Sequence, residues 1–453
     1  MKTASSNRSL PVLSVLLILI SSTLLAIWSI KNTIALRNSL LALGAIAGLL
    51  FLINYPKDLK RTPYLARLSQ FIPLIFAGCM FIWVLIHYIG FSQDFALQSQ
   101  ELTSTWLRAM LASIIGAAAG LALRDHPIRS QFLWAGLLSS FIYLLIHYLG
   151  AYTQSGMVFM PNYYFSSPFG NKINAVLMGN LFISAICGCA ADFLKQKQIH
   201  LSWGIYLFWL LGTLTILFSF TTIIDTRNGI GISLILISTW ALYVGSVMLK
   251  SQLTTRERSW KFSILLLIPF FIGIIFVQQH LSINRGWNHF IDDVSVAIQI
   301  NEVPNWQNVK KYGYPRTNSG ELVYPNNYER AAWATAGIET IAANPLGYGL
   351  LEHSLGRLIR KSYPEAVIQS AHSAWIDYGL AFGIPGLIFT IGALISIIVI
   401  AAQSQAPQRF TAIWMASGIL LIFTFAEVSS KHTIEILFFC IALLNTMVLE
   451  KKN

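Results

Sequence analysis

The most constraining feature of this chain is a repeated run of about 20 apolar residues, separated by shorter polar stretches. Such a run crosses the hydrocarbon core of a bilayer as a helix, because lipid cannot pair with unsatisfied backbone N–H and C=O groups. Charged residues make up only 11% of the sequence, against about 25% in soluble proteins. We therefore predict an all-α, polytopic integral membrane protein.

Apolar windows along the sequence predict about 12 transmembrane helices. The predicted spans are residues 11–30, 35–53, 70–90, 105–123, 131–150, 173–191, 203–222, 228–249, 262–279, 384–402, 410–427 and 432–449. The largest hydrophilic interval lies between the ninth and tenth of these spans. The chain accordingly divides into residues 1–279 with helices 1–9, a loop subdomain at 280–371, and residues 372–453 with helices 10–12.

The distribution of Lys and Arg predicts the orientation. Short loops on one side carry most of these residues, including Lys60, Arg124 and Lys195, whereas those on the other side carry few. Positive charge is retained on the cytoplasmic side, so both termini are expected there and residues 280–371 outside. The net charge of +12 follows this topology, and no basic stripe with interleaved aromatic residues predicts nucleic-acid binding.

The large outer loop is too long for a simple connector and contains its own helix signals, so we expect a small, mainly helical subdomain. Asn326 and Asn327 are expected to cap a helix that runs to Asn344, where Pro345 ends it. Binding and catalytic residues are often found in such ordered loops. Function is therefore expected to concentrate at this side of the membrane.

His372 is the first candidate catalytic residue, because it lies where the loop returns to the membrane and a new helix begins. The positive end of the helix dipole disfavours imidazolium, and a neutral imidazole suits a general base near neutral pH. Ser370 or Ser373 is expected to cap the same turn. A structural role for His372, as an interfacial side chain or a cap, is the alternative that the residue alone leaves open.

Arg227 is the second candidate, since it breaks the positive-inside pattern and begins the eighth span. Arginine at a helix N-terminus opposes the dipole by about 0.3 to 1 kcal/mol, which favours a nearby anion. A planar guanidinium suits bidentate contact with phosphate. A local ion pair with Asp225 is the alternative.

Arg330 is expected in the first turn of the predicted loop helix, so the same argument applies, and the two arginines indicate one anion site. An ion pair with Glu329 or Glu339 would also explain Arg330. Lys172 supplies a third positive group at the outer side, unless its side chain simply extends to the bilayer surface.

Other chemistry is not indicated by the sequence. Arg108 lies inside the fourth apolar run, close enough to its outer end to reach the interface. Asp292 and Asp293 are adjacent and predict a solvated helix face better than a metal site. The four cysteines all fall in apolar runs, and no phosphate loop or metal-binding spacing occurs. We expect no disulfide, metal or cofactor.

Several motifs resemble those of the O-antigen ligase and polymerase superfamily. His372-Ser-Ala-Trp-Ile-Asp-Tyr-Gly-Leu-Ala-Phe-Gly-Ile-Pro-Gly386 resembles its His-(Asn/Ser)-x-x-Leu motif followed by Gly-x-x-Gly. Further matches, in family order, are Ser167-Pro-Phe-Gly-Asn171, Thr226-Arg-Asn-Gly-Ile-Gly-Ile232, Tyr328-Glu-Arg-Ala-Ala-Trp333 and Asn344-Pro-Leu-Gly-Tyr-Gly349. Ile232 departs from the pattern, where a leucine is common. These motifs cover most of the second half of the chain.

The resemblance implies a GT-C-like glycosyltransferase in a bacterial inner membrane, with its large loop in the periplasm. Such an enzyme moves a preassembled glycan from undecaprenyl diphosphate to an acceptor, with inversion and without a metal. The implied catalytic residues are His372 as general base, with Arg227 and Arg330. Arg227, Arg330 and Lys172 would bind the donor diphosphate. Gly383, Pro385 and Gly386 are expected to break the tenth helix.

Family members differ in their acceptor, and the sequence leaves this choice open. The motifs look most like those of O-antigen ligases, whose acceptor is lipid A–core. An O-antigen polymerase or a protein oligosaccharyltransferase is the alternative within the superfamily. A lipid or polysaccharide transporter is the alternative from another class, but transporters usually place ionisable groups near the membrane midplane, whereas the candidate residues cluster at one surface.

Overall fold

The computed structural model describes residues 6–55, 68–195, 202–251, 289–352, 354–428 and 431–449, together with residues 275 and 278. Every extended element in these ranges is a helix, and the only β feature among them is an isolated bridge between Arg316 and Leu322. The described part of the chain is therefore all-α, as the apolar runs predict.

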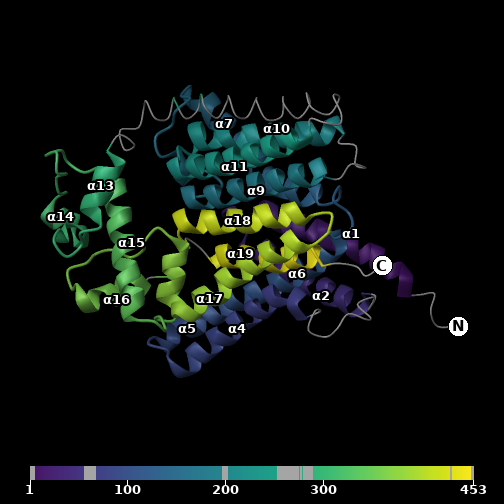
Figure 1. The fold of residues 1–453 in the computed structure, drawn as a ribbon, viewed down its shortest axis with the longest axis horizontal. Helices are drawn as coiled ribbons and strands as arrows, with labels where there is room; N and C mark the ends of the chain where they lie inside the picture. The colour runs from purple at the N-terminus through teal and green to yellow at the C-terminus, as the bar shows by residue number, and fades with distance from the viewer. Residues whose placement is uncertain are drawn as a thin grey trace.

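Long helices form one bundle (Figure 1). They are α1 (Ser6–Ile27), α2 (Ile34–Asn54), α4 (Ile72–Gly90), α5 (Phe95–Glu101) continuing through a π-helical turn (Leu102–Trp106) into α6 (Leu107–Leu123), α7 (Gln131–Ser155), α9 (Lys172–Lys195), α10 (Trp203–Phe218) with a π-helical end (Ser219–Ile223), α11 (Arg227–Ser251), α17 (Ala374–Gln403), α18 (Arg409–Phe425) and α19 (Lys431–Met447). A four-residue helix, α8 (Tyr163–Ser166), precedes α9.

Within the described ranges, nine helices are long and apolar enough to cross a membrane. They correspond to the predicted spans 1–8 and 10. The helices at the last two predicted spans, α18 and α19, have 17 residues each. The predicted ninth span, residues 262–279, lies outside the described residues apart from two isolated positions. The chain is thus a helical membrane protein.

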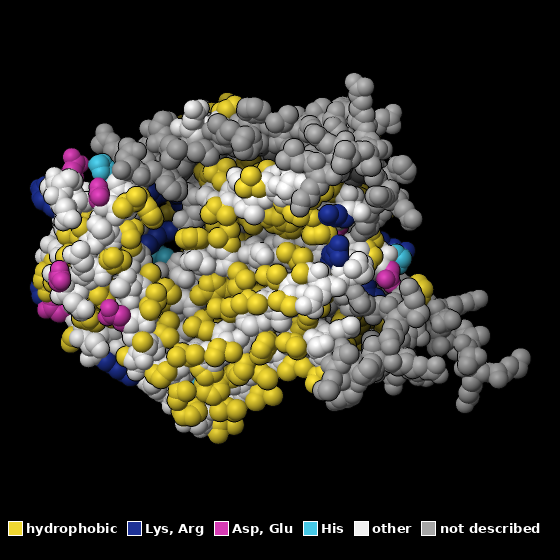
Figure 2. Space-filling model, in the orientation of Figure 1, with side chains coloured by type: hydrophobic (Ala, Val, Ile, Leu, Met, Phe, Trp, Pro, Cys, Tyr) yellow, Lys and Arg dark blue, Asp and Glu magenta, His cyan; other side chains and the backbone are white. Residues whose placement is uncertain are grey.

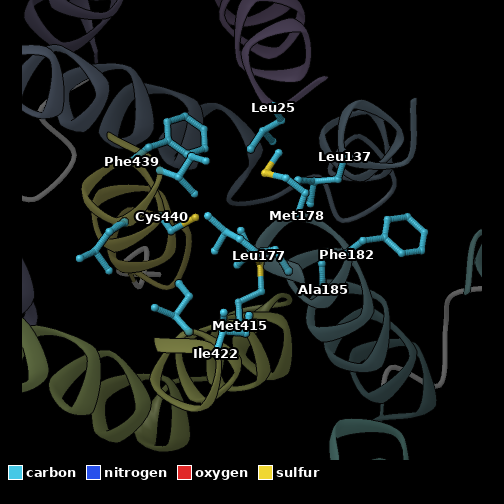
Figure 3. Packing of buried hydrophobic residues seen from close by; sticks show 14 of the residues in the cluster. Leu25, Leu137, Leu177, Met178, Phe182, Ala185, Met415, Ile422, Phe439 and Cys440 are labelled. Atoms are coloured by element: carbon cyan, nitrogen blue, oxygen red, sulfur yellow. The ribbon is translucent and has the colours of Figure 1, made fainter. Parts of the chain in front are cut away.

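Two helices form the centre of the bundle. Every residue of α9 from Asn174 to Phe193 is buried, and so is every residue of α19 from His432 to Met447. Figure 3 shows side chains of α9 meeting those of α1, α7, α18 and α19. Helix α6 approaches α19 closely because Gly116 and Gly120 carry no side chain, and a Cβ at Gly116 would overlap the Phe439 carbonyl. This four-residue spacing of glycines is common where membrane helices meet.

The outside of the bundle is apolar, and Figure 2 shows hydrophobic side chains over the middle of its visible face. Exposed large residues recur on successive turns, such as Ile82, Leu85 and Ile89 on α4. Monomeric soluble proteins rarely expose continuous apolar surface on this scale. A lipid environment explains it.

A helical lobe stands at one end of the bundle (Figure 1). It comprises α13 (Phe290–Ala297), a 3₁₀ helix (Pro304–Gln307), α14 (Val309–Tyr312), α15 (Pro325–Ala343) and α16 (Ser354–Ser362). Its core includes Trp306, Tyr328 and Leu358, and it extends onto Ile376 and Leu380 of α17. The lobe therefore packs on the bundle directly, and we call the bundle end beneath it the loop face.

Helix α15 begins earlier than the sequence pattern predicts, so the expected caps are wrong. Pro325 takes the first helical position, which suits its fixed φ and missing N–H. The capping carboxylate belongs to Asp293, which accepts bonds from Tyr324 N at 3.0 Å and from Asn327 Nδ2 at 2.9 Å. Asp293 is fully buried, so the expected solvated face holds only for Asp292, which is exposed.

Helix α17 contains the predicted break. Gly383 has φ 65° and ψ −163°, which are not helical angles. Beyond this break the helix continues through Pro385 to Gln403, away from the loop face. The break frees the carbonyls of Leu380, Ala381 and Phe382, whose helical partners would be four residues later.

The segment Pro345–Gly349 and helix α4 satisfy these freed groups. Tyr348 N donates to Leu380 O at 2.8 Å and Gly349 N donates to Ala381 O at 2.6 Å. Trp83 Nε1 of α4 donates to Phe382 O at 2.8 Å. Ile384 N, displaced from its helical acceptor, donates to Pro345 O at 2.8 Å. The Asn-Pro-x-Gly-x-Gly motif thus holds the lobe to the broken helix.

Replacing Gly383 by alanine should destabilise the protein by about 1–3 kcal/mol or more, because a side chain at this left-handed φ is strained. Its Cβ would also overlap Pro345 O. Gly78→Ala is the matched control, since nothing lies within 4 Å of a Cβ there. Thermal unfolding of the purified variants in detergent measures the effect, and equal unfolding temperatures for the two would refute this account of the break.

Candidate functional site

A cavity of about 350 Å³ opens at the loop face between the lobe and the bundle. All four candidate site residues line it: Lys172, Arg227, Arg330 and His372. They come from the starts of α9 and α11, from α15, and from the turn before α17. In Figure 2, Lys, Arg and His atoms show in the hollow between lobe and bundle. We call this space the basic cavity.

A tight turn presents His372 to the cavity. Its φ is 55°, a left-handed value that a non-glycine residue adopts at a cost of about 1–3 kcal/mol. His372 N donates to Ser370 Oγ at 3.2 Å, and Ala374 N donates to Ala426 O at 2.8 Å. Ser370 therefore caps this turn, one of the two expected possibilities, whereas Ser373, the N-cap residue of α17, makes no side-chain cap bond.

The imidazole of His372 lies between an aromatic ring and a carboxylate. It stacks on Trp333 with ring centroids 5.4 Å apart. Its Nδ1 lies 2.7 Å from Glu427 Oε2, which also accepts a bond of 2.5 Å from Ser370 Oγ. A carboxylate at Nδ1 holds a proton on that nitrogen, which leaves Nε2 to accept one.

Glu427 is the residue that sequence reasoning missed, although it lines the same cavity. Burial acts to raise the pKa of its carboxyl. Hydrogen bonds from His372 and Ser370, together with the electrostatic effect of the neighbouring His372 and Arg330 side chains, outweigh burial and lower the pKa below its ordinary value of 4.5. The carboxylate is therefore ionised at neutral pH. Its position directly after an apolar run was the available signal.

Glu427→Gln should lower the unfolding temperature by about 2 °C at neutral pH, because charge-assisted hydrogen bonds are lost. A folded-state pKa below 4.5 means that this stabilisation is present above pH 4.5 and is lost as the pH falls through the folded-state value. Thermal unfolding in detergent at pH about 7 and about 3 should show the difference from wild type closing in acid. A difference that persists or widens in acid would contradict the assignment.

Arg227 begins α11 and faces the lobe across the cavity. Its guanidinium lies 4.9 Å from the centre of the Tyr324 ring, a cation–π arrangement. The turn before it is held by Thr226, whose N donates to Phe220 O at 2.9 Å and whose Oγ1 accepts from Gly229 N at 3.3 Å. Asn228 Nδ2 donates to Phe425 O at 2.7 Å. The start of α11 is thereby fixed beside the 425–427 segment.

Arg330 lies in the second turn of α15 rather than the first, because that helix begins at Pro325. The dipole argument does not apply to it. Within the described residues, no carboxylate lies within ion-pair distance of its guanidinium. Burial in the cavity and repulsion from Arg227 lower its pKa from 12.5, while Glu427 and Glu329 oppose the shift. It remains cationic at neutral pH, and an anion in the cavity would relieve the repulsion.

Lys172 is tied into the cavity wall, not extended to the bilayer surface. Its Nζ donates to Asp225 O at 2.6 Å and lies 4.7 Å from the centre of the Tyr164 ring. The lining thus holds three cationic side chains against the carboxylates of Asp225 and Glu427, leaving one excess positive charge before His372 is counted.

Arg108 does not belong to this cavity. Its Nη1 lies 3.7 Å from Glu435 Oε1, and the other oxygen of Glu435 accepts from Trp28 Nε1 at 2.7 Å. A partner on α19 therefore accounts for Arg108, in place of the expected reach to the interface. No cluster of metal-binding side chains occurs among the residues that the structure describes.

Comparison with known proteins gives no assignment: no family model and no curated protein matches this chain.

Proposed function

We propose that this protein is a glycosyltransferase of the O-antigen ligase type. It would transfer a preassembled glycan from undecaprenyl diphosphate to a sugar hydroxyl of lipid A–core, at the periplasmic face of a bacterial inner membrane. The observation that carries the proposal is the meeting of a histidine–carboxylate pair with Arg227, Arg330 and Lys172 in one cavity at the loop face.

The charge of the basic cavity supports a diphosphate-bearing donor. Arg227 lines the basic cavity from the bundle, and Arg330 lines it from the lobe. Two planar guanidinium groups in one cavity suit the several oxygens of a diphosphate. Lys172 adds a point charge in the same cavity. The outside of the bundle exposes large apolar side chains, so the lipid tail of such a donor would remain in the bilayer beside them while its headgroup enters the cavity.

The reaction would be a single displacement. Nε2 of His372 takes the proton from the acceptor hydroxyl as that oxygen bonds to C1 of the donor sugar. The bond from C1 to the diphosphate oxygen breaks, and undecaprenyl diphosphate leaves with the electron pair. Arg227 and Arg330 stabilise the negative charge that develops on it. Attack opposite the leaving group inverts the configuration at C1.

Glu427 would act through His372 as a positioning residue. Its carboxylate holds the proton on Nδ1 and stabilises the imidazolium that forms at Nε2, as the aspartate does in serine hydrolases. Ser370 restricts the Glu427 carboxylate by a hydrogen bond, and Trp333 restricts the His372 ring by stacking on it.

A lipopolysaccharide gel from cells that lack the gene tests the function. Loss of the ligase leaves rough core without glycan, while polymerised glycan accumulates on its lipid carrier. A single repeat unit attached to core would indicate the polymerase instead. Unchanged smooth lipopolysaccharide would exclude both, and would leave a protein acceptor or a transport role to be examined.

A further inference from the structure

A second cavity, of about 220 Å³, also lies at the loop face. Its polar lining consists of Gln100, Glu101, Thr105, Glu352 and Lys431, and leucine and valine side chains complete its walls. These polar residues come from the junction of α5 and α6, from the segment before α16, and from the start of α19. The proposed mechanism uses none of them.

The π-helical turn at Leu102–Trp106 shapes one wall of this cavity. Such turns often occur at functional sites. Thr103 donates to Ser99 O at 3.3 Å, in the pattern usual for a helical threonine. Thr105 is 1% exposed, yet its Oγ1 has no hydrogen-bond partner among the described residues. A buried hydroxyl without a partner is costly, so a ligand or water is expected to pair with it.

The charged groups of this wall are held in place by the protein itself. Both carboxylate oxygens of Glu101 accept from Leu351 N, at 3.0 and 3.1 Å. Lys431 Nζ donates to Ser104 Oγ at 2.7 Å. Glu352 is exposed and lines the same cavity. The site thus offers a held carboxyl group and a held ammonium group together with one exposed carboxylate.

The lining differs from that of the basic cavity, where three cationic side chains gather. Here the carboxyl groups of Glu101 and Glu352 stand beside one ammonium group, that of Lys431, and the amide of Gln100. Sugar hydroxyls both donate to carboxyl oxygens and accept from ammonium and amide N–H groups. Apolar walls with a few placed polar groups are typical of small-molecule sites. The lining therefore fits an uncharged, hydroxyl-rich saccharide.

One short segment separates the two cavities. Ala426 and Glu427 line the basic cavity, and the next residue, Val428, lines the second. Asp377 fixes this segment: its Oδ2 accepts from Val428 N at 3.3 Å, and its Oδ1 accepts from Ala371 N at 3.5 Å. A saccharide in the second cavity would therefore lie across this segment from the His372–Glu427 pair.

We infer that the second cavity is a saccharide-binding subsite that holds the core oligosaccharide of the acceptor while its reacting hydroxyl extends to His372. This inference rests on the proposed function. It assigns the donor to the basic cavity and the acceptor to the second cavity, on either side of residues 426–428.

Steady-state kinetics of the purified full-length protein in detergent test the subsite, with undecaprenyl diphosphate-linked glycan as donor and rough lipopolysaccharide as acceptor. Glu352→Gln and Thr105→Val should each raise KM for the acceptor about tenfold, with KM for the donor unchanged. Glu321→Gln is the matched control, because Glu321 is an exposed carboxylate of the lobe that lines neither cavity. An unchanged acceptor KM, or a rise in donor KM instead, would overturn the inference.

Direct binding separates failure of the subsite from failure of the proposed function. Core oligosaccharide cleaved from lipid A should bind the His372→Ala variant, and adding Glu352→Gln should weaken binding about tenfold. If the added substitution weakens binding in this way but the wild-type protein transfers no glycan, the saccharide site is supported and the ligase function is rejected. Equal binding by the single and double variants would reject the site whatever the activity.

Discussion

Replacing His372 by alanine is expected to reduce glycan transfer by about 10²–10⁴-fold, the usual contribution of a general base. The variant keeps the turn backbone and the remaining lining of the basic cavity, so donor binding should persist. Transfer by purified protein, at saturating donor and acceptor, measures the loss. His289→Ala is the control, because His289 is an exposed histidine that does not line this cavity.

Two further measurements make this prediction specific to His372 as the general base. His372→Ala protein should unfold about 2 °C below wild type, like Glu427→Gln, because both variants lose the His372–Glu427 hydrogen bond. A shift of that size leaves the protein folded, which separates lost chemistry from lost folding. Full-length glycan attached to lipid A–core by this variant would remove His372 from the mechanism. The histidine would then have a structural role beside Trp333.

Arg330→Ala and Arg227→Ala should each lower kcat/KM for the lipid-linked donor by about 10²–10³-fold, because each removes a cation from the leaving diphosphate. Lysine at either position should restore only part of the activity, since it lacks the bidentate fork. The double variant should lose less than the product of the two single losses, as expected for groups that contact one ligand.

Arg316→Ala is the matched control for the arginines. Arg316 is exposed in the same lobe, donates to Gly320 O at 2.6 Å and does not line the basic cavity. Its loss should leave donor use unchanged. If the Arg227 and Arg330 variants matched this control, the diphosphate role of the basic cavity would have no support.

The sequence predicts the features that depend on local pattern. Apolar length predicts the spans, and the glycine and proline residues around 383–386 predict the break in α17, because each depends on neighbouring residues alone. Arg227 and His372 are candidates from the sequence because a helix start and an apolar run make a charged or titratable side chain conspicuous. The first-turn argument for Arg330 is wrong, since its helix begins at Pro325 and the residue lies in the second turn, but the structure places it in the same cavity as the other candidates.

What the sequence does not predict depends on contacts between distant segments. Ser370 and Glu427 are 57 residues apart, and no local pattern indicates that the end of α18 meets the start of α17. Asp293 looks like half of a solvated pair until the lobe folds and its carboxylate caps α15. Arg108 looks like an isolated membrane charge until α6 packs on α19 and brings Glu435 beside it.

Transfer by the purified protein tests the central claim most directly. Full-length protein in detergent is mixed with undecaprenyl diphosphate-linked glycan and rough lipopolysaccharide, without nucleotide sugar, and both products are measured. We predict glycan on lipid A–core and free undecaprenyl diphosphate in equal amounts, both absent with His372→Ala. Folded wild-type protein that leaves the lipid-linked glycan intact in the presence of this acceptor would contradict the account.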